Sequence, residues 1–356
     1  MRLTHYRSVA SIAAWFAAVG AVRAAEPSTI PGKRLPEIKE PVLLGTAEAD
    51  AIAAALQVFP PDNAWNTDIS RWPLHPNSAA IVASIGNDKP LRYNTDMSYV
   101  FVPPGQKLVD VAIVEYPDES DKGPYPVPDN TPIEGWPAWH RRDAEQKLTL
   151  EEVQRDKLNQ GGDRHAIVVD PYAGKLYEFY QMKRTDPASG EQASGGRRLP
   201  EPRWQCACAA IFNLRTNDLR QGGWTSADAA GLPIYPAVIR YDELAAGKVN
   251  HAMRVTVRST RRAYVAPATH FASRKTDENL PRMGERLRLK AGYDIRGFSP
   301  EVQTILKGLK QYGMLVADNG LEWAISCAPD ERIPVLHEEL RRVKGSAFEV
   351  VRAPER

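Results

Sequence analysis

Residues 166–182 read AIVVDPYAGKLYEFYQM, and this stretch indicates the fold class more clearly than any other part of the chain. Its first five residues are rich in β-branched side chains, and its last eight are rich in aromatic and aliphatic ones. Pro171-Tyr172-Ala173-Gly174 separates the two runs and has the composition of a tight turn. The stretch therefore predicts an antiparallel β-hairpin.

Several other segments are typical of short strands. Residues 251–258 alternate between apolar and polar side chains, and we expect residues 263–271 to pair with them as a second hairpin. Residues 314–317 and 321–326 flank Asp318-Asn319-Gly320, where Asn-Gly is a strong turn signal, so a third hairpin is predicted there. Further candidate strands are residues 108–116, 207–214, 286–290 and 347–351.

Few helices are expected. The clearest begins at Ser299 as N-cap, has Pro300 at its first position and ends at Gly313. Shorter helices are predicted near residues 46–56, 77–86, 149–158 and 334–343. Many short strands with few helices predict a mainly β fold, either a β-sandwich or a partly closed barrel with a few peripheral helices. An α+β fold with a mixed sheet is the alternative.

The N-terminus has the pattern of a secretory signal peptide over residues 1–25. Arg2 and Arg7 precede a mostly apolar run, and the small residues before the cleavage position predict a cut near Ala24. An uncleaved anchor is the alternative. We therefore expect a secreted or periplasmic protein without stable membrane insertion. Residues 26–45 are predicted to form a Pro-rich N-terminal arm, and residues 46–356 a single β-rich domain with peripheral helices.

Charge and motifs exclude several function classes. The 46 basic and 44 acidic residues leave a net charge of +2, which gives no electrostatic reason to expect a nucleic-acid partner. We expect a monomer. The chain has no G-x-S-x-G, Walker A, H-E-x-x-H or G-x-G-x-x-G motif, which argues against a lipase, an NTPase, a zincin and a Rossmann oxidoreductase.

Three cysteines, Cys206, Cys208 and Cys327, allow one internal pair. An oxidising compartment favours a disulfide from Cys206 or Cys208 to Cys327. Free buried thiols are the second interpretation, and a zinc site is the third, although the spacing matches no common ligand pattern.

Histidines and carboxylates are the candidate catalytic groups. If the second hairpin turns at residues 260–261, His251 lies opposite His270, close enough to share a metal, a proton or an anionic group. Asp163 and His165, two apart in sequence, could share one face and provide an acid–base pair. Asp228 lies among small residues and is a candidate general base or hydrogen-bond anchor. Core histidines and turn-capping aspartates are the structural alternatives.

Loop tryptophans are the candidate substrate-binding groups. Trp136 and Trp224 lie in Gly- and Pro-containing segments, where an indole ring can stack on a sugar face. Arg254, on the alternating strand, is a third candidate for substrate binding. Anchoring of the loops by the tryptophans is the structural alternative.

A resemblance is carried by six stretches, which read GDRHAIVVDPYAGKLYEFY, WTSADAAGLPIYPAVIRYDE, VNHAMRVTV, AYVAPATHFAS, GERLRLKAGYDI and LKQYGMLVADNG. Through them the chain resembles a group of secreted bacterial proteins without an established activity, over about residues 59–351. The resemblance implies export and a single unit, and it assigns no catalytic residue. The three cysteines depart from the group, which has small residues there, so no general chemical role for them is implied.

These features favour an exported polysaccharide-active enzyme, a glycoside hydrolase or a polysaccharide lyase that uses carboxylate and histidine acid–base groups. The expected partner is a polysaccharide or a cell-surface glycan. A non-catalytic glycan or cell-surface binding protein is the first alternative, and a metal-dependent hydrolase built on a histidine cluster is the second. No cofactor is assigned, but the histidines and carboxylates would allow a divalent metal.

Overall fold

The computed structural model describes residues 29–141, 147–185 and 203–354. The predicted signal peptide and the first residues of the predicted arm lie outside these ranges. Within them the chain forms three open sheets with a few short helices, and none of the three closes into a barrel. The prediction of a chain with many strands and few helices is confirmed.

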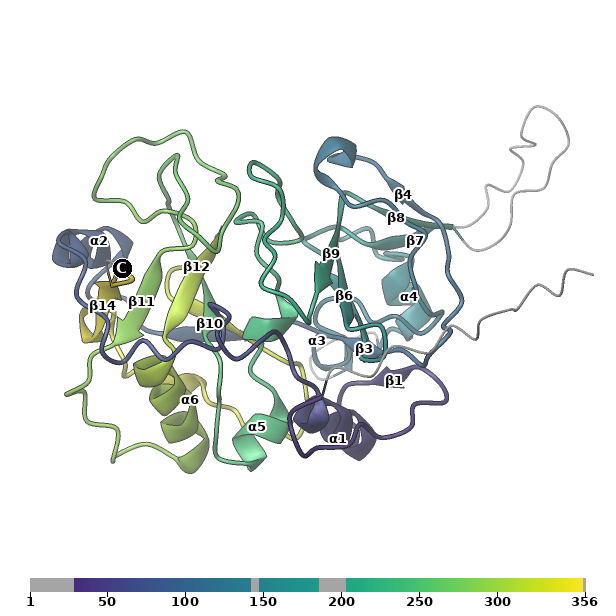
Figure 1. Cartoon of the computed structure of the whole chain (residues 1–356), viewed down its shortest axis with the longest axis horizontal. Coiled ribbons are helices and arrows are strands. Elements are labelled where there is room, and N and C mark those ends of the chain that lie inside the picture. The colour runs from purple at the N-terminus through teal and green to yellow at the C-terminus, as the bar shows by residue number, and fades with distance from the viewer. Residues whose placement is uncertain (1–28, 142–146, 186–202, 355–356) are drawn as a thin grey trace, which may run out of the picture.

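The largest sheet has six strands in the order β14-β11-β12-β10-β13-β2, on the left of Figure 1. The second has five in the order β1-β3-β5-β6-β9, and the third has three in the order β4-β8-β7. Each contains parallel and antiparallel neighbours, as the alternative prediction of a mixed sheet allowed. The strand bounds are β1 Val42–Leu43, β2 Arg92–Thr95, β3 Val100–Phe101, β4 Val111–Ile113, β5 Ala166–Asp170, β6 Lys175–Tyr180, β7 Lys183–Thr185, β8 Arg203–Cys206, β9 Cys208–Asn213, β10 Met253–Val257, β11 Arg286–Leu289, β12 Met314–Asn319, β13 Ala324–Cys327 and β14 Phe348–Val351.

The first predicted hairpin is confirmed as β5 and β6, which pair antiparallel from Ala166↔Phe179 to Asp170↔Lys175. Asp170 stabilises the turn because its Oδ1 accepts hydrogen bonds from the backbone N–H groups of Tyr172 and Ala173, at 3.0 and 2.8 Å. Strand β5 is buried on both faces, so alternate residues contribute to two different hydrophobic clusters. One cluster joins the two large sheets, and the other lies between the five-stranded and three-stranded sheets.

The second and third predicted hairpins are wrong. Strand β10 lies between β12 and β13, parallel to β12 and antiparallel to β13, so the two strands that flank Asn319-Gly320 do not pair with each other. Residues 263–271 form no strand, and they contribute a single bridge between Tyr264 and Met283. The expected pairing of His251 with His270 is therefore absent. Strand β10 is buried at four of its five positions and occupies the sheet interior, which local turn signals do not encode.

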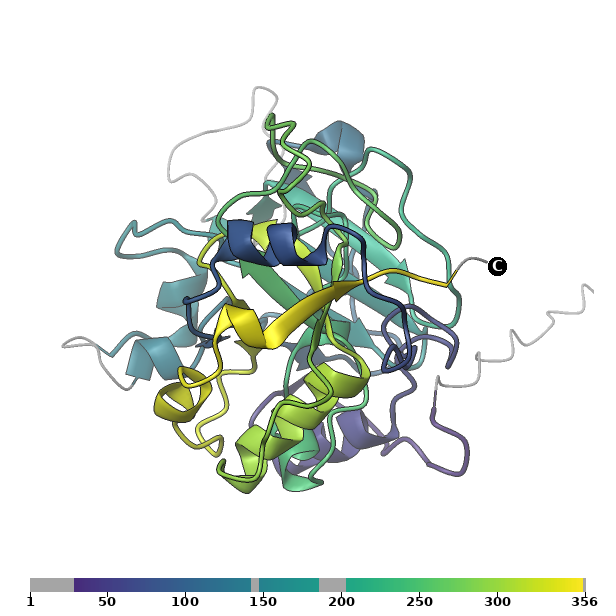
Figure 2. The same cartoon turned by 90° about the vertical axis from the view of Figure 1, so that its left-hand side faces the viewer.

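The helices agree with prediction better than the strand pairings do. The bounds are α1 Ala47–Ala55, α2 Ser78–Ile85, α3 Ala138–Arg141, α4 Leu150–Gln154, α5 Tyr241–Ala245, α6 Pro300–Gln311 and α7 His337–Leu340, with 3₁₀ turns at Pro117–Glu119, Tyr235–Ala237 and Gly345–Ala347. Helix α6 buries the stripe Val302, Ile305, Leu306 and Leu309. Figure 2 shows α2 and α6 on either side of the edge strand β14. No helix of the described ranges is both long and apolar enough to cross a membrane.

The three cysteines are free and buried, so the structure does not contain the predicted disulfide. Cys206 ends β8, Cys208 begins β9, and Cys327 ends β13, which places each in a different sheet. Burial raises the pKa of the Cys206 thiol to about 12. A thiol that holds its proton so firmly is a poor nucleophile and a poor metal ligand.

Candidate functional site

The candidate site is built around residues 224–231, WTSADAAG, which we call the central segment. It connects the two large sheets through its backbone: the carbonyl of Ala227 accepts a hydrogen bond from His165 Nε2, and the amide of Ala230 donates to the carbonyl of Ala317 in β12, both at 3.0 Å. Ser226 closes a turn inside the segment, since its Oγ accepts from the Asp228 amide at 3.0 Å and donates to the Leu232 carbonyl at 2.6 Å. Short polar side chains thus hold an otherwise apolar segment in place.

Asp228 of the central segment and Arg254 of β10 form a buried bidentate ion pair. Arg254 Nε donates to Asp228 Oδ2 at 2.9 Å, Nη2 donates to Oδ1, and Nη1 donates to Ser326 Oγ at 2.7 Å. Both side chains are almost completely buried. Asp228 is therefore a hydrogen-bond anchor with no free oxygen for a substrate, and Arg254 lies out of reach of one.

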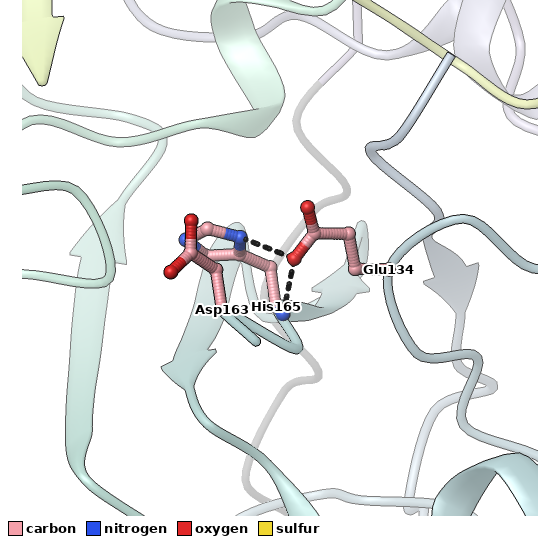
Figure 3. A group of neighbouring side chains, drawn as sticks. All are labelled: Glu134, Asp163 and His165. Carbon is pink, nitrogen blue, oxygen red and sulfur yellow. Dashed lines mark hydrogen bonds and ion pairs between the residues drawn. The ribbon is translucent and has the colours of Figure 1, made fainter. Parts of the chain in front are cut away.

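His165, the residue before β5, is fixed by Glu134 from a distant loop (Figure 3). Glu134 Oε2 accepts hydrogen bonds from His165 Nδ1 at 3.0 Å and from the His165 backbone amide at 3.2 Å. Because Nε2 also faces an oxygen, that of Ala227, both ring nitrogens must donate, and the ring is an imidazolium. Burial alone would lower the pKa of His165, but the hydrogen bond and the charge of Glu134 outweigh burial and raise it to about 9.

The pKa of Glu134 is shifted in the opposite direction to that of His165. Burial alone would raise the pKa of its carboxyl group, but the hydrogen bond and the charge of His165 outweigh burial and lower it. Glu134 is therefore ionised at neutral pH. Glu134 carries no sequence signal of this role, because it lies 31 residues from His165 in a loop with no motif around it.

Asp163 lies beside this pair and is exposed. Arg164, between Asp163 and His165, has a φ of 46° and donates hydrogen bonds to the carbonyl groups of Met182 and Val153. The side chains of Asp163 and His165 lie next to each other (Figure 3). One ligand atom each from Glu134, Asp163 and His165 lies within 4.8 Å of the others. The three could hold a divalent ion if Nδ1 of His165 exchanged its proton for the metal.

Asp318, at the end of β12, completes the site on the side of the six-stranded sheet. It is half-buried; the Ala229 amide donates to its Oδ2 at 3.4 Å, and the Asn319 amide donates to its Oδ1 at 2.6 Å. Burial and the negative charge of Asp228 raise the pKa of Asp318 to about 7, although Arg254 opposes them. Asp318 was not among the predicted site residues, because the Asp-Asn-Gly sequence indicates a turn.

Tyr180, the last residue of β6, is also part of the site. Its pKa is raised to about 12 by burial and by the negative charges of Asp163 and Asp318, so its phenol lies in the field of both carboxyl groups. Its ring centroid is 5.8 Å from that of His165. Tyr180 therefore lies beside His165, and the charges of both Asp163 and Asp318 act on its phenol.

Asp96 is a further carboxyl group that sequence reasoning missed. It is 4% exposed, and its Oδ1 has no hydrogen-bond partner among the described residues. Burial and the charge of Glu134 raise the pKa of Asp96 to about 8. Asp96 is therefore mostly neutral at pH 7 and adds little negative charge to the site.

The other predicted site residues are only partly brought together. His270 flanks the central segment, with its Nδ1 2.8 Å from the Ala229 carbonyl oxygen, and Trp224 is the first residue of the segment, with the Arg220 guanidinium 5.6 Å from its ring. Trp136 follows Glu134 closely in sequence but is 7% exposed and packs in the core. Trp136 therefore offers no ring face for a substrate.

His251 belongs to a different cluster. Its Nε2 lies 2.8 Å from Glu243 Oε1 of α5, and the same oxygen accepts from Arg240 Nη2 at 2.9 Å. His251 is thus paired with α5, and it does not meet His270 as the sequence analysis expected.

Glu178 of β6 is a fully buried carboxyl group near the site. Its Oε1 accepts hydrogen bonds from the backbone amides of Ile234 and Tyr235, at 2.9 and 2.8 Å. Burial raises the pKa of Glu178 from 4.5 to about 7, the two amides oppose this, and the charges of Asp228 and His165 act in opposite directions. The folded protein thus holds a proton that the unfolded chain releases.

Stability should therefore fall as pH rises from about 4.5 to about 7, because the unfolded state binds fewer protons there. In Glu178→Gln, the single side-chain oxygen can still accept the hydrogen bonds of both backbone amides. The substitution removes the titrating carboxyl group. We compare the melting temperature of the variant with that of the unchanged protein at each pH. We expect the variant's melting temperature minus that of the unchanged protein to be larger at pH 7.5 than at pH 5. The same difference at both pH values would contradict the assignment.

No family model matches the chain, and no curated protein or solved structure is significantly similar to it. The interpretation of the site therefore depends on its geometry.

Proposed function

We propose that the protein is an exported polysaccharide-active enzyme that cleaves glycosidic bonds by acid–base catalysis beside the central segment. The observation that carries the proposal is a half-buried Asp318 that holds its proton near neutral pH in the same site as an ionised Glu134 and an exposed Asp163. Carboxyl groups whose environments favour opposite protonation states are what a glycosidase needs. The export is inferred from the pattern of residues 1–25.

In this proposal Asp318 donates its proton to the leaving glycosidic oxygen. Asp163, the most exposed carboxylate of the site, acts on the opposite side, either as the base that takes a proton from the attacking water or as the nucleophile whose glycosyl ester is then hydrolysed by water. Glu134 and His165 position the start of β5, and Asp228 raises the pKa of Asp318 through its charge. Elimination is less well supported, because both nitrogens of His165 already donate hydrogen bonds and the pKa of Tyr180 is raised to about 12. The site therefore favours hydrolysis over lyase chemistry.

A metal-dependent hydrolase is the second candidate, and one observation favours it. Glu134, Asp163 and His165 offer ligand atoms within 4.8 Å of one another. One histidine and two carboxylates suit a divalent cation with open positions for water.

A reducing-end release assay tests the proposal. The purified protein is incubated with plant, fungal and bacterial polysaccharides, with and without EDTA. Release that persists in EDTA supports carboxylate hydrolysis. Release that EDTA abolishes and added divalent metal restores would replace it with the metal-dependent hydrolase. Retention on a polysaccharide without release would indicate a glycan-binding protein, and neither release nor retention would overturn the assignment to polysaccharides.

A further inference from the structure

A pocket of about 590 Å³ adjoins the end of the central segment at Gly231. Its walls come from residues 59–72, from Phe212 of β9 and the loop that follows β9, and from residues 231–233, 266–267 and 353–354. Gly231 ends the central segment and lines the pocket, so one continuous piece of chain connects the pocket with the proposed acid–base site. The volume is in the range of pockets that bind small ligands.

Aromatic rings form much of the lining. Trp65, Phe59 and Phe212 are buried, whereas Trp72 is half-buried. Trp72 is therefore the ring of this lining on which a sugar could stack, in contrast to the buried Trp136. An indole face and the CH face of a pyranose pack favourably because both are apolar and flat.

Planar polar groups form the rim beside these rings. Asn63 Nδ2 donates to Asn217 Oδ1 at 2.8 Å, and Asn217 Nδ2 donates to Asp62 Oδ1 at 3.0 Å. Each carboxylate or amide oxygen can accept a second hydrogen bond, and each amide has a second N–H. The rim can therefore bind neighbouring hydroxyl groups, which each donate and accept.

The charge of the lining is negative. Asp62 and Asp218 line the pocket, and Arg220, the one arginine among the described lining residues, is already occupied. Arg220 Nε donates to the Thr225 carbonyl and Nη2 to the Glu119 carbonyl, both at 2.8 Å, while Nη1 pairs with Asp121. Among the described lining residues, a uronate or sulfate group would meet two carboxylates and no free cation, so an uncharged sugar fits this lining and an anionic sugar does not.

We infer that this pocket binds an uncharged sugar unit of a polysaccharide and that the protein acts on neutral rather than acidic polysaccharides. The inference rests on the proposed function for the class of ligand. It adds a substrate-binding site formed by Trp72, Asn63, Asn217 and Asp62 that is separate from the acid–base groups.

Affinity electrophoresis through gels that contain xylan, mannan, mixed-linkage glucan or polygalacturonate tests the inference. We expect the mobility of the protein to fall in at least one neutral gel and to stay unchanged in polygalacturonate. Trp72→Ala should weaken the retention about tenfold or more, because it removes the stacking face. Asn217→Ala, at an exposed position, should weaken it less and serves as a second variant that keeps the aromatic core intact.

Trp139→Ala is the matched control, because Trp139 is 47% exposed and lies outside the pocket lining. Retention by polygalacturonate alone, or equal retention of the Trp72 and Trp139 variants, would overturn the inference. The same measurements distinguish a failure of this inference from a failure of the proposed function. Retention that Trp72→Ala abolishes, without any release of reducing ends, keeps the pocket and rejects catalysis. Release that Trp72→Ala leaves unchanged in both KM and kcat keeps catalysis and rejects the pocket.

Discussion

Replacing Asp228 with alanine is expected to lower the free energy of unfolding by about 3–5 kcal/mol, because the change would leave a buried guanidinium without its counter-ion. Arg254 is 3% exposed, and two of its three hydrogen-bonding nitrogens donate to Asp228. Ser326 accepts from the third nitrogen, but a hydroxyl cannot balance the charge. The central segment should also lose its attachment to β10, so local and global stability are both affected.

Urea unfolding of the purified variants measures this effect. The double variant Asp228→Ala/Arg254→Met should recover part of the stability, because it removes the unpaired charge and leaves an apolar side chain in its place. Asp294→Ala is the control, since Asp294 pairs with Arg296 on the surface and its loss should leave the unfolding midpoint nearly unchanged. If the double variant were as unstable as the two single losses added together, Asp228 and Arg254 would not be coupled as described.

Local features of the fold could be predicted, and pairings between distant segments could not. The β5–β6 hairpin and helix α6 carry their signals within their own residues, as a Pro-Tyr-Ala-Gly turn and as an N-cap with an apolar stripe. The place of β10 between β12 and β13 has no such signal. Asn319-Gly320 reverses the chain, but four residues suffice to carry it over β10 to the far side, and burial of β10 then decides the pairing.

The candidate site was partly predictable for the same reason. Asp163 and His165 are neighbours in sequence, and they remain neighbours in the structure. Glu134 and Asp96 come from separate loops, and only the fold brings them to His165. For tryptophans, position in a loop does not determine exposure: Trp136 is buried in the core, whereas Trp72 lines a pocket. Sequence reasoning finds residue types suited to a chemistry, and tertiary packing decides which of them reach the solvent.

The buried ion pair and the proposed acid are linked through electrostatics. Asp228 cannot exchange protons with a substrate, because both its oxygens are bound by Arg254. Its charge nevertheless acts on Asp318 and, together with burial, raises the pKa of that carboxyl group. An anchor that only held the central segment could have been neutral, so a fixed charge at this position suits a site that must keep a neighbouring carboxyl group protonated.

Asp318→Asn is expected to lower kcat by about 10²–10⁴-fold on whichever polysaccharide the release assay identifies, which is the range for removal of a general acid. The amide keeps the shape of the side chain but cannot donate a proton to the leaving oxygen. In the unchanged protein, kcat should fall as pH rises through about 7, because the protonated form of Asp318 is the active one. KM should change little, since the pocket with Trp72 lies apart from this group.

The leaving group of the substrate separates acid catalysis from a structural effect. The dinitrophenolate group of a dinitrophenyl glycoside leaves without protonation. The Asp318→Asn variant should therefore hydrolyse this glycoside at nearly the rate of the unchanged protein, although the variant fails on the polysaccharide. Asp88→Asn, at an exposed position outside the site, is the matched control and should act normally on both substrates. An Asp318 variant impaired equally on both substrates, or a rate that does not decline above pH 7, would show that Asp318 is not the acid. Asp163→Asn should instead fail on both substrates, because the base or nucleophile is needed whatever group departs.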